Sequence, residues 1–126
     1  MSALVVDTSS WVSYFAGRGS PLIDDALAES RVHLPVVVAA ELLSGRLSAR
    51  DRKDLEDLLS DLPLSGTERE HWFRVGRLRA GLQPRGVTVS TPDAHVAQCA
   101  LDLGGSLLTE DRVFRLIAAH AGLTLA

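Results

Sequence analysis

Short apolar runs alternate with helical patterns along this chain, and few folds accommodate such an alternation. We predict strands at residues 3–6, 32–34, 106–109 and 123–125, and a further short strand could lie at 62–64. Strands that alternate with helices form a parallel sheet with helices packed on its faces. The sequence therefore predicts an α/β fold, in which a parallel β-sheet is flanked by α-helices.

The segments between these runs carry the spacing of amphipathic helices. The leucines between positions 55 and 62 form one apolar stripe. Thr67 followed by Glu70 has the pattern of a capping box, which predicts a helix start there, and Thr91 is expected to cap the next helix. The predicted helices lie at about 11–16, 20–30, 35–44, 55–62, 67–83, 91–103 and 114–121.

The composition indicates a single soluble domain over residues 1–126. Hydrophobic residues make up 46% of the chain and charged residues 23%, which is ordinary for a globular protein. The longest apolar run, 34–43, is too short to span a membrane, and the N-terminus lacks the pattern of a signal peptide. We therefore expect a cytoplasmic protein with no membrane contact. Because the net charge is -3, any nucleic-acid contact must come from a local basic patch.

Cysteine and histidine positions do not predict a zinc site. Cys99 is the single cysteine, so it cannot form an internal disulfide, and its sequence neighbours are not those of a zinc motif. It lies among small residues and is expected to be packed. His33, His71 and His120 show no metal-ligand spacing and are interpreted as incidental. His95, near Asp93, could touch substrate or water.

Four acids stand where chemistry would take place. Asp7 directly follows the first predicted strand, and Asp111 lies just beyond the strand that ends at Thr109. Sites in parallel sheets form at the carboxyl ends of the strands. Asp93 lies in the first turn of a predicted helix. Glu41 lies in the most apolar stretch of the chain, so we expect a buried carboxylate that needs a partner or a metal ion.

Each acid also has a purely structural explanation. Asp7 and Asp111 could cap helices, Asp93 could interact with the dipole of its helix, and Glu41 could point to solvent. Taken together, the four positions are better explained by one shared site. Two close carboxylates repel by about 4 kcal/mol at an effective dielectric near 20, and a divalent cation removes that cost. Oxygen ligands favour Mg²⁺ or Mn²⁺, and the natural chemistry of such a site is phosphodiester hydrolysis.

Four segments, in order along the whole chain, resemble the PIN domain family and specifically its VapC-type toxins. Asp7-Thr8-Ser9 resembles the acid and hydroxyl motif after the first strand, and Glu41 resembles the second acid. The segment 92–100 resembles the acid that opens a helix of small residues. The segment 107–114 resembles the closing motif, a threonine, an acid two residues on, and a phenylalanine. Asp111 fits this spacing better than the adjacent Glu110.

The resemblance implies a PIN-like α/β/α sandwich and a metal-dependent ribonuclease, a hydrolase that cleaves RNA internally. It implies a cognate antitoxin that blocks the site, and a homodimer. Asp7 and Asp93 would bind Mg²⁺ or Mn²⁺ most directly. Asp111 would complete the metal site directly or through water. Glu41 would also contribute to the metal site, and it would position a metal-bound water or receive the proton of that water.

Residues around the acids are candidates for supporting them and for binding substrate. Thr109 and Ser9 would donate hydrogen bonds to the carboxylates of the metal site, and they would lie where the RNA substrate binds. Arg112 and Arg115 follow Asp111 and are the arginines expected to hold the RNA backbone. A solvated helix face is the alternative explanation for these and the other arginines.

Two other functions compete with the nuclease. The first is a catalytically silent PIN-like module that only binds its partner, although the presence of all four acids argues against it. The second is a phosphoryl-transfer or signalling domain, because Asp7-Thr8 superficially resembles an aspartyl nucleophile. The single lysine, Lys53, lies in a charged helix away from any strand end, and no P-loop motif is present.

Overall fold

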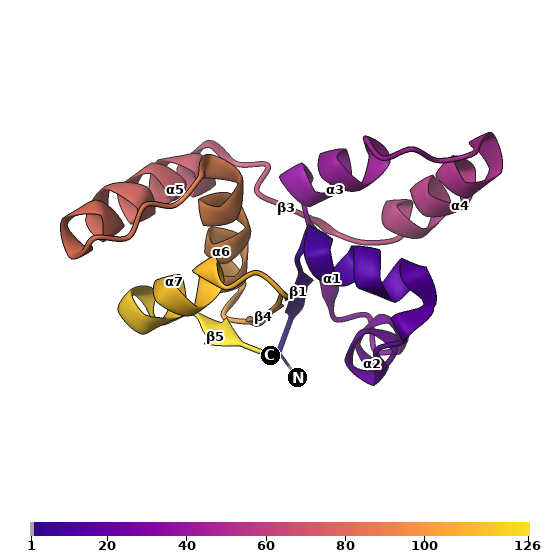
Figure 1. The fold of residues 1–126 in the computed structure, drawn as a ribbon, viewed down its shortest axis with the longest axis horizontal. Helices are drawn as coiled ribbons and strands as arrows, with labels where there is room; N and C mark the ends of the chain where they lie inside the picture. Colours follow the sequence, from indigo (N-terminus) through magenta and orange to yellow (C-terminus); the bar gives the residue numbers. More distant parts are fainter. Residues whose placement is uncertain (1) are drawn as a thin grey trace.

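A computed structural model describes residues 2–126, and within them the strands form one five-stranded parallel sheet. Its order is β3-β2-β1-β4-β5, so the first strand of the chain lies at the centre (Figure 1). Leu4 pairs with Val32 of β2 on one side and with Ser106 of β4 on the other. The strands are β1 (Leu4–Val6), β2 (Val32–Pro35), β3 (Leu64–Ser65), β4 (Ser106–Leu108) and β5 (Thr124–Leu125). The predicted parallel sheet is thus confirmed.

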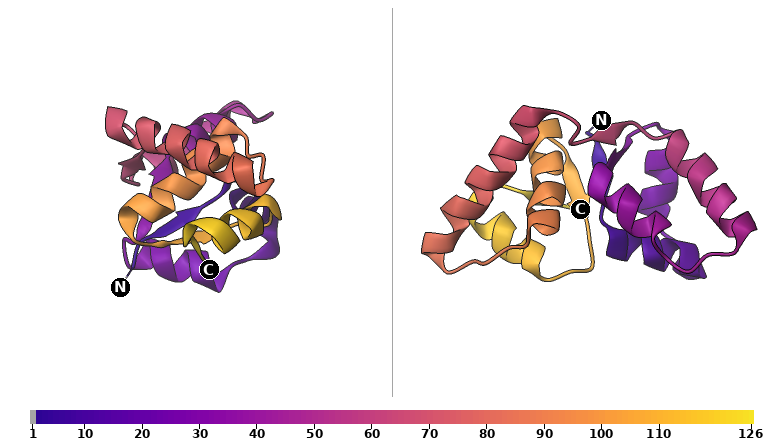
Figure 2. Two further views of the ribbon diagram at one scale, coloured as in Figure 1. Left: turned by 90° about the vertical axis from the view of Figure 1, so that its left-hand side faces the viewer. Right: turned by 90° about the horizontal axis from the view of Figure 1, so that it is seen from above.

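The helices form two groups on opposite sides of the sheet (Figure 1, Figure 2). The first group contains α1 (Thr8–Ser13), the π-helical turn η1 (Tyr14–Arg18), α2 (Pro21–Ala28), α3 (Val36–Leu43) and α4 (Ala49–Ser60). The second group contains α5 (Arg69–Leu82), the 3-10 turn η2 (Gln83–Arg85), α6 (Thr91–Leu103) and α7 (Val113–Ala121). This is the predicted α/β/α sandwich. Over the described residues, no helix is both long enough and apolar enough to span a bilayer.

The central strand explains why the sheet needs helices on both faces. Leu4, Val5 and Val6 are all buried, with at most 1% of any of them exposed. Because successive strand residues point to opposite faces, an all-apolar strand is stable only when both faces are covered. Trp11 of α1 and Phe114 of α7 are the largest fully buried side chains.

One glycine is required by close contact between backbones. A Cβ atom at Gly105, just before β4, would lie 2.4 Å from the carbonyl oxygen of Ala3, just before β1. No side chain fits at that distance, because the contact is with backbone and cannot rotate away. Gly105 therefore allows β4 to approach the central strand.

Two predicted helix caps are wrong. Helix α5 begins at Arg69 with Glu68 as its N-cap and without a side-chain cap hydrogen bond, so Thr67 and Glu70 do not form a capping box. Helix α6 is capped by Ser90, whose Oγ accepts a hydrogen bond from the Asp93 N–H at 3.2 Å. Thr91 is instead the first residue of that helix, because helical geometry begins one residue earlier than it would if Thr91 were the cap.

Candidate metal-dependent active site

The backbone and side chain of Asp7 have separate partners. Its carbonyl oxygen accepts hydrogen bonds from the N–H groups of Ser10 and Trp11, each at 3.1 Å, and so starts helix α1. Its carboxylate does not cap that helix. Instead, Oδ2 accepts hydrogen bonds from Thr109 Oγ1 at 2.9 Å and Ser9 Oγ at 3.4 Å. The expected alternative, in which the Asp7 side chain serves only as a helix cap, is therefore wrong.

Thr109 and Ser9 connect Asp7 to the loop that follows β4. The Thr109 hydroxyl accepts a hydrogen bond from the Asp111 N–H at 3.0 Å while it donates to Asp7. The Ser9 hydroxyl accepts from the Glu110 N–H at 3.1 Å. Both hydroxyls thus hold the loop and the Asp7 carboxylate in one arrangement.

Burial and neighbouring charges raise the pKa values of two of the acids. Asp7 is buried, and desolvation raises the pKa of its carboxyl; the charge of Glu41 raises it further, against the lowering effect of the Thr109 and Ser9 hydrogen bonds. Desolvation also raises the pKa of the half-buried Asp93, and the charges of Asp111, Asp7 and Glu41 add to this effect. The four carboxylates therefore lie close enough for their charges to interact, and we call them the acid cluster.

Glu41 is exposed, and our expectation of a buried carboxylate is wrong. Helix α3 turns Val38 and Leu42 into the core, whereas Glu41 lies on the helix face at the edge of the protein. Its Oε1 accepts a hydrogen bond from Thr8 Oγ1 at 2.8 Å. The general apolarity of a segment therefore does not determine the direction in which one of its residues points.

Asp111 lies beyond β4 in an exposed loop. Its Oδ1 accepts a hydrogen bond from the Val113 N–H at 3.1 Å, at the start of α7, so one of its oxygens does have a capping role. Arg112 and Arg115 are both exposed. Arg115 lines a cavity of about 160 Å³ together with Thr109 and Asp111, which places this cation beside one member of the acid cluster.

The donor chemistry of the acid cluster fits a hard divalent cation. Its donors are all carboxylate oxygens, and burial, with the charges of the neighbouring acids adding to it, raises the pKa values of Asp7 and Asp93. Within the described residues, no three of these acids bring ligand oxygens within 4.8 Å of one another. Mg²⁺ commonly binds one or two carboxylates directly and keeps several waters. The four carboxylates therefore do not converge on one ion in this arrangement, and an ion held here would need water between it and some of them.

A different group of three residues does bring its potential ligand atoms close together, and the sequence analysis did not predict this group. His71, His95 and Cys99 are all buried, and they bring ligand atoms within 4.8 Å of one another. Cys99 is packed in the core as expected, and spacing along the sequence did not indicate that His71 lies against it and His95. The available signal was the four-residue spacing of His95 and Cys99, which places both on one face of a helix. His71 comes from another helix and could not be paired with them by spacing.

This chain has a parallel sheet, and acidic residues follow the carboxyl ends of its strands β1 and β4. It therefore belongs to the class of α/β domains that carry their site at that edge of the sheet. The family model for the PIN domain matches residues 4–120, and the chain belongs to the PIN domain family. The chain is also similar to Ribonuclease VapC11 from Mycobacterium tuberculosis, with 30% identity over 130 residues that cover 98% of this chain and 97% of that protein.

Solved structures share the same fold. A DNA-bound VapBC complex from Salmonella typhimurium contains a chain that matches with a TM-score of 0.82 and 22% identity, covering 100% of this chain and 98% of that one. VapBC2 from Rickettsia felis, bound to a DNA fragment from its promoter, matches with a TM-score of 0.78 and 19% identity, covering 98% of this chain and 97% of that one. At these identities the two structures support the fold alone.

Proposed function

We propose that this chain is a Mg²⁺- or Mn²⁺-dependent endoribonuclease, which acts as the toxin of a toxin–antitoxin pair and is inhibited by a cognate antitoxin. The observation that carries the proposal is the electrostatic coupling of Asp7, Glu41, Asp93 and Asp111 at one edge of a PIN domain. The similarity to a VapC ribonuclease supports RNA as the substrate and, because VapC proteins are toxins of such pairs, a cognate antitoxin as the partner.

Each acid has a role that follows from its position. Asp7, held by Thr109 and Ser9, and Asp93, at the start of α6, would hold the ion. Asp111 would complete the site directly or through water. When bound, the cation neutralises charge on the phosphate and makes water a stronger nucleophile. Glu41 is exposed and held by Thr8, so it can orient the attacking water or accept its proton.

Arg112 and Arg115 would bind the RNA backbone. Both are exposed and follow Asp111, and a guanidinium binds phosphate oxygens through a planar fork of donors. The net charge of -3 makes such local cations necessary, because the rest of the protein does not attract RNA.

The antitoxin would occupy an apolar groove between η1 and α4. Phe15, Leu47, Leu55 and Leu58 line a cavity of about 470 Å³ there. Phe15 is 46% exposed, although it stacks on the buried Trp11 with ring centroids 5.5 Å apart. An exposed apolar patch of this kind is typical of a protein-binding surface. We also expect a homodimer, which a measurement of mass in solution tests.

Cleavage of RNA with controlled metal content tests the nuclease. Purified protein is incubated with labelled structured RNAs in Mg²⁺, in Mn²⁺ and in EDTA, beside the Asp7→Asn variant. We expect cleavage with either metal, none in EDTA, and none with the variant. Cleavage that persists in EDTA would contradict the metal mechanism. Absence of a Mn²⁺ site that depends on Asp7 and Asp93 in a metal titration would favour the silent binding module.

A further inference from the structure

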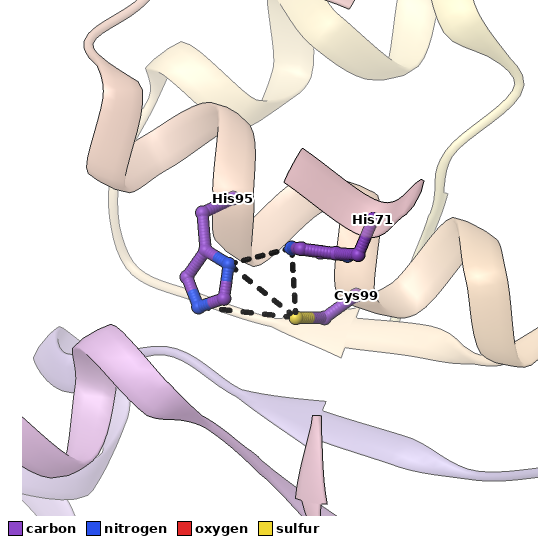
Figure 3. A group of neighbouring side chains, drawn as sticks. All are labelled: His71, His95 and Cys99. Carbon is purple, nitrogen blue, oxygen red and sulfur yellow. Dashed lines mark hydrogen bonds between the residues drawn. The ribbon is translucent and has the colours of Figure 1, made fainter. Parts of the chain in front are cut away.

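The second group of interest consists of His71 on α5 and of His95 and Cys99 on α6, which we call the His–Cys cluster (Figure 3). His71 Nε2 lies 2.7 Å from His95 Nδ1. Cys99 Sγ lies 4.0 Å from the first nitrogen and 3.9 Å from the second. The three residues are at most 3% exposed. Three potential metal ligands thus converge in the interior, from two helices.

The triangle of donor atoms is close in size to a metal site. A point about 2.1 Å from all three atoms lies in their plane, whereas Zn–N bonds measure roughly 2.0–2.1 Å and Zn–S bonds roughly 2.3 Å in a tetrahedral site. Tetrahedral ligands at these lengths lie roughly 3.4 Å apart, so the two nitrogens, now 2.7 Å apart, must separate by about 0.7 Å to hold an ion. The ion would then lie out of the plane of the three atoms, with a fourth position for water.

Glycine at position 66 keeps space open beside these nitrogens. Gly66 has φ +90°, and a Cβ there would lie 2.3 Å from His95 Cε1, 3.0 Å from His95 Nδ1 and 3.1 Å from His71 Nε2. Gly66, His71 and Cys99 also line a cavity of about 280 Å³. An ion and its water can reach the His–Cys cluster through that cavity.

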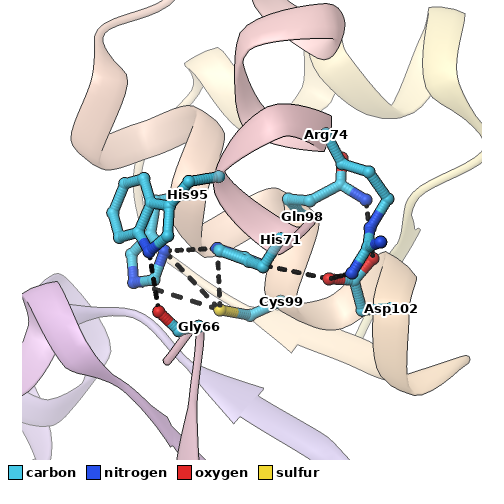
Figure 4. Close-up of polar contacts among 8 residues, drawn as sticks. Gly66, His71, Arg74, His95, Gln98, Cys99 and Asp102 are labelled. Carbon is cyan, nitrogen blue, oxygen red and sulfur yellow. Dashed lines mark hydrogen bonds and ion pairs between the residues drawn. The ribbon is translucent and has the colours of Figure 1, made fainter. Parts of the chain in front are cut away.

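Hydrogen bonds around the His–Cys cluster orient His71 as metal ligands usually are oriented (Figure 4). His71 Nδ1 lies 2.9 Å from Asp102 Oδ2, and Asp102 in turn accepts hydrogen bonds from Arg74 and Gln98. A carboxylate on one imidazole nitrogen directs the lone pair of the other toward the metal. Asp102 thus leaves an unprotonated His71 Nε2 facing His95 and Cys99.

We propose that His71, His95 and Cys99 form a binding site for a borderline-soft divalent cation such as Zn²⁺, separate from the acid cluster. Two imidazoles and a thiolate favour Zn²⁺, whereas Mg²⁺ and Mn²⁺ favour the oxygens of the acid cluster. The ion would join α5 to α6, and Asp93 stands at the start of α6. The site is independent of the proposed nuclease function, since it shares no ligand with it.

Without an ion, the same residues form a consistent chain of hydrogen bonds, which an ion must rearrange. Asp102 accepts a hydrogen bond from His71 Nδ1–H, which leaves His71 Nε2 as an acceptor. His95 Nδ1–H then donates to His71 Nε2. The other nitrogen of His95, Nε2, accepts a hydrogen bond from the Val37 N–H at 3.3 Å. Ion binding moves the His95 proton from Nδ1 to Nε2, so the Val37 hydrogen bond is lost.

The protonation states of the ligands set the remaining cost. Burial raises the pKa of Cys99 to about 12, so the thiol gives up one proton to solvent for each ion bound. A coordinated cation supplies the positive charge that makes this ionisation favourable.

Titration with Co²⁺ in excess Mg²⁺ tests the proposal, because a Co²⁺–thiolate bond produces a charge-transfer absorption that oxygen ligation does not. The full chain and its Asp7→Asn, Cys99→Ser and Asp102→Asn variants are compared, with circular dichroism to verify folding. We expect one equivalent in the wild type and in D7N, no charge-transfer band in C99S, and affinity about 10- to 100-fold weaker in D102N. Absence of the band from the wild type, its persistence in C99S, or its loss in D7N would each overturn the site.

A second measurement needs only the wild type and covers the case in which C99S does not fold. Zn²⁺ is added to ¹⁵N-labelled protein, and the Val37 amide is followed by NMR. We expect a large shift that is complete at one equivalent, because His95 Nε2 stops accepting the hydrogen bond. If the Val37 amide does not respond to Zn²⁺, the His–Cys cluster is only a hydrogen-bonded group and the proposal is wrong.

Discussion

Thr109 Oγ1 donates a hydrogen bond of 2.9 Å to Asp7 Oδ2, and thereby joins two residues that stand 102 positions apart in the chain. The same hydroxyl accepts from the Asp111 N–H at 3.0 Å. One side chain therefore connects the end of the central strand to the loop that carries another of the four acids. The placement of Asp7 depends on this contact as well as on its own backbone.

Replacement of Thr109 by valine tests that dependence. Valine keeps the shape of the side chain but removes the hydroxyl, which lowers the pKa of Asp7 in the wild type. We expect Mn²⁺ affinity and RNA cleavage to fall about 10- to 100-fold, measured by calorimetry and by RNA cleavage assays. Thr109→Ser is the matched control and should retain most of both. Wild-type affinity in the valine variant would show that the hydrogen bond does not position Asp7.

Replacement of Asp7 by asparagine should separate activity from stability. Asparagine can still accept from Thr109 but removes a buried charge that Glu41 repels. We expect cleavage to fall about 100-fold or more, while the free energy of unfolding in EDTA stays equal or rises. Urea denaturation and cleavage assays on the same sample measure the two effects. A large loss of stability would mean that Asp7 has a structural role.

The raised pKa of Asp7 predicts a pH dependence of stability in EDTA. A group whose pKa is higher in the folded state stabilises the fold while it is protonated, and this contribution is lost as pH rises through the folded-state value. The free energy of unfolding should therefore decrease as pH rises above the ordinary aspartate value of 3.8, because of Asp7 and Asp93. The decrease should be smaller in D7N, and Mn²⁺ should suppress it in the wild type.

Asp102 provides the control of opposite sign for that experiment. Although burial raises its pKa, the hydrogen bonds from Arg74, Gln98 and His71 lower it below 3.8 overall. Its contribution to stability is thus present above pH 3.8 and is lost as pH falls through the lowered value. The D102N variant should change the urea-denaturation profile below about pH 4 and leave the decrease above it unaltered. An unaltered decrease in D7N would contradict the assignment to Asp7.

Two glycine substitutions should change stability in opposite directions. Gly105→Ala places a Cβ 2.4 Å from the Ala3 carbonyl oxygen, whereas a Cβ at Gly76, inside helix α5, meets no atom within 4 Å. We expect Gly105→Ala to lower the free energy of unfolding by about 1–3 kcal/mol and Gly76→Ala to raise it by about 0.5–1 kcal/mol. Urea denaturation measures both. Tolerance of alanine at 105 would show that β1 and β4 can separate without loss.

Replacement of Phe15 by alanine tests the groove that we assign to the antitoxin. We expect the affinity for the antitoxin to fall by more than about 1 kcal/mol, while cleavage of RNA by the free protein is unchanged. Phe73→Ala is the matched control, because Phe73 is 54% exposed on α5 and lies outside the groove. Calorimetry with the co-purified antitoxin measures both variants. Equal losses in the two would place the interface elsewhere.

The sequence predicted those features that depend on neighbouring residues. Strand β1 was predictable because an apolar run is followed directly by Asp7. The end of α6 was predictable because it is followed by Gly104, and glycine readily takes the left-handed conformation observed there, with φ 60°. The exposure of Glu41 was not predictable, since the face that α3 turns to the core depends on how the helix packs. The pairing of His71 with His95 depends in the same way on the packing of α5 against α6.

The distance in sequence between Asp7 and Thr109 has a consequence for synthesis of the protein. The ribosome adds Asp7 near the start of synthesis. The Asp7 carboxylate then has no hydrogen bond from Thr109 until residue 109 has been added. No nascent chain shorter than 111 residues contains the whole acid cluster, because Asp111 is its last member, even though the central strand is already made. The order of translation thus delays any nuclease activity in the vicinity of the chain's own messenger RNA.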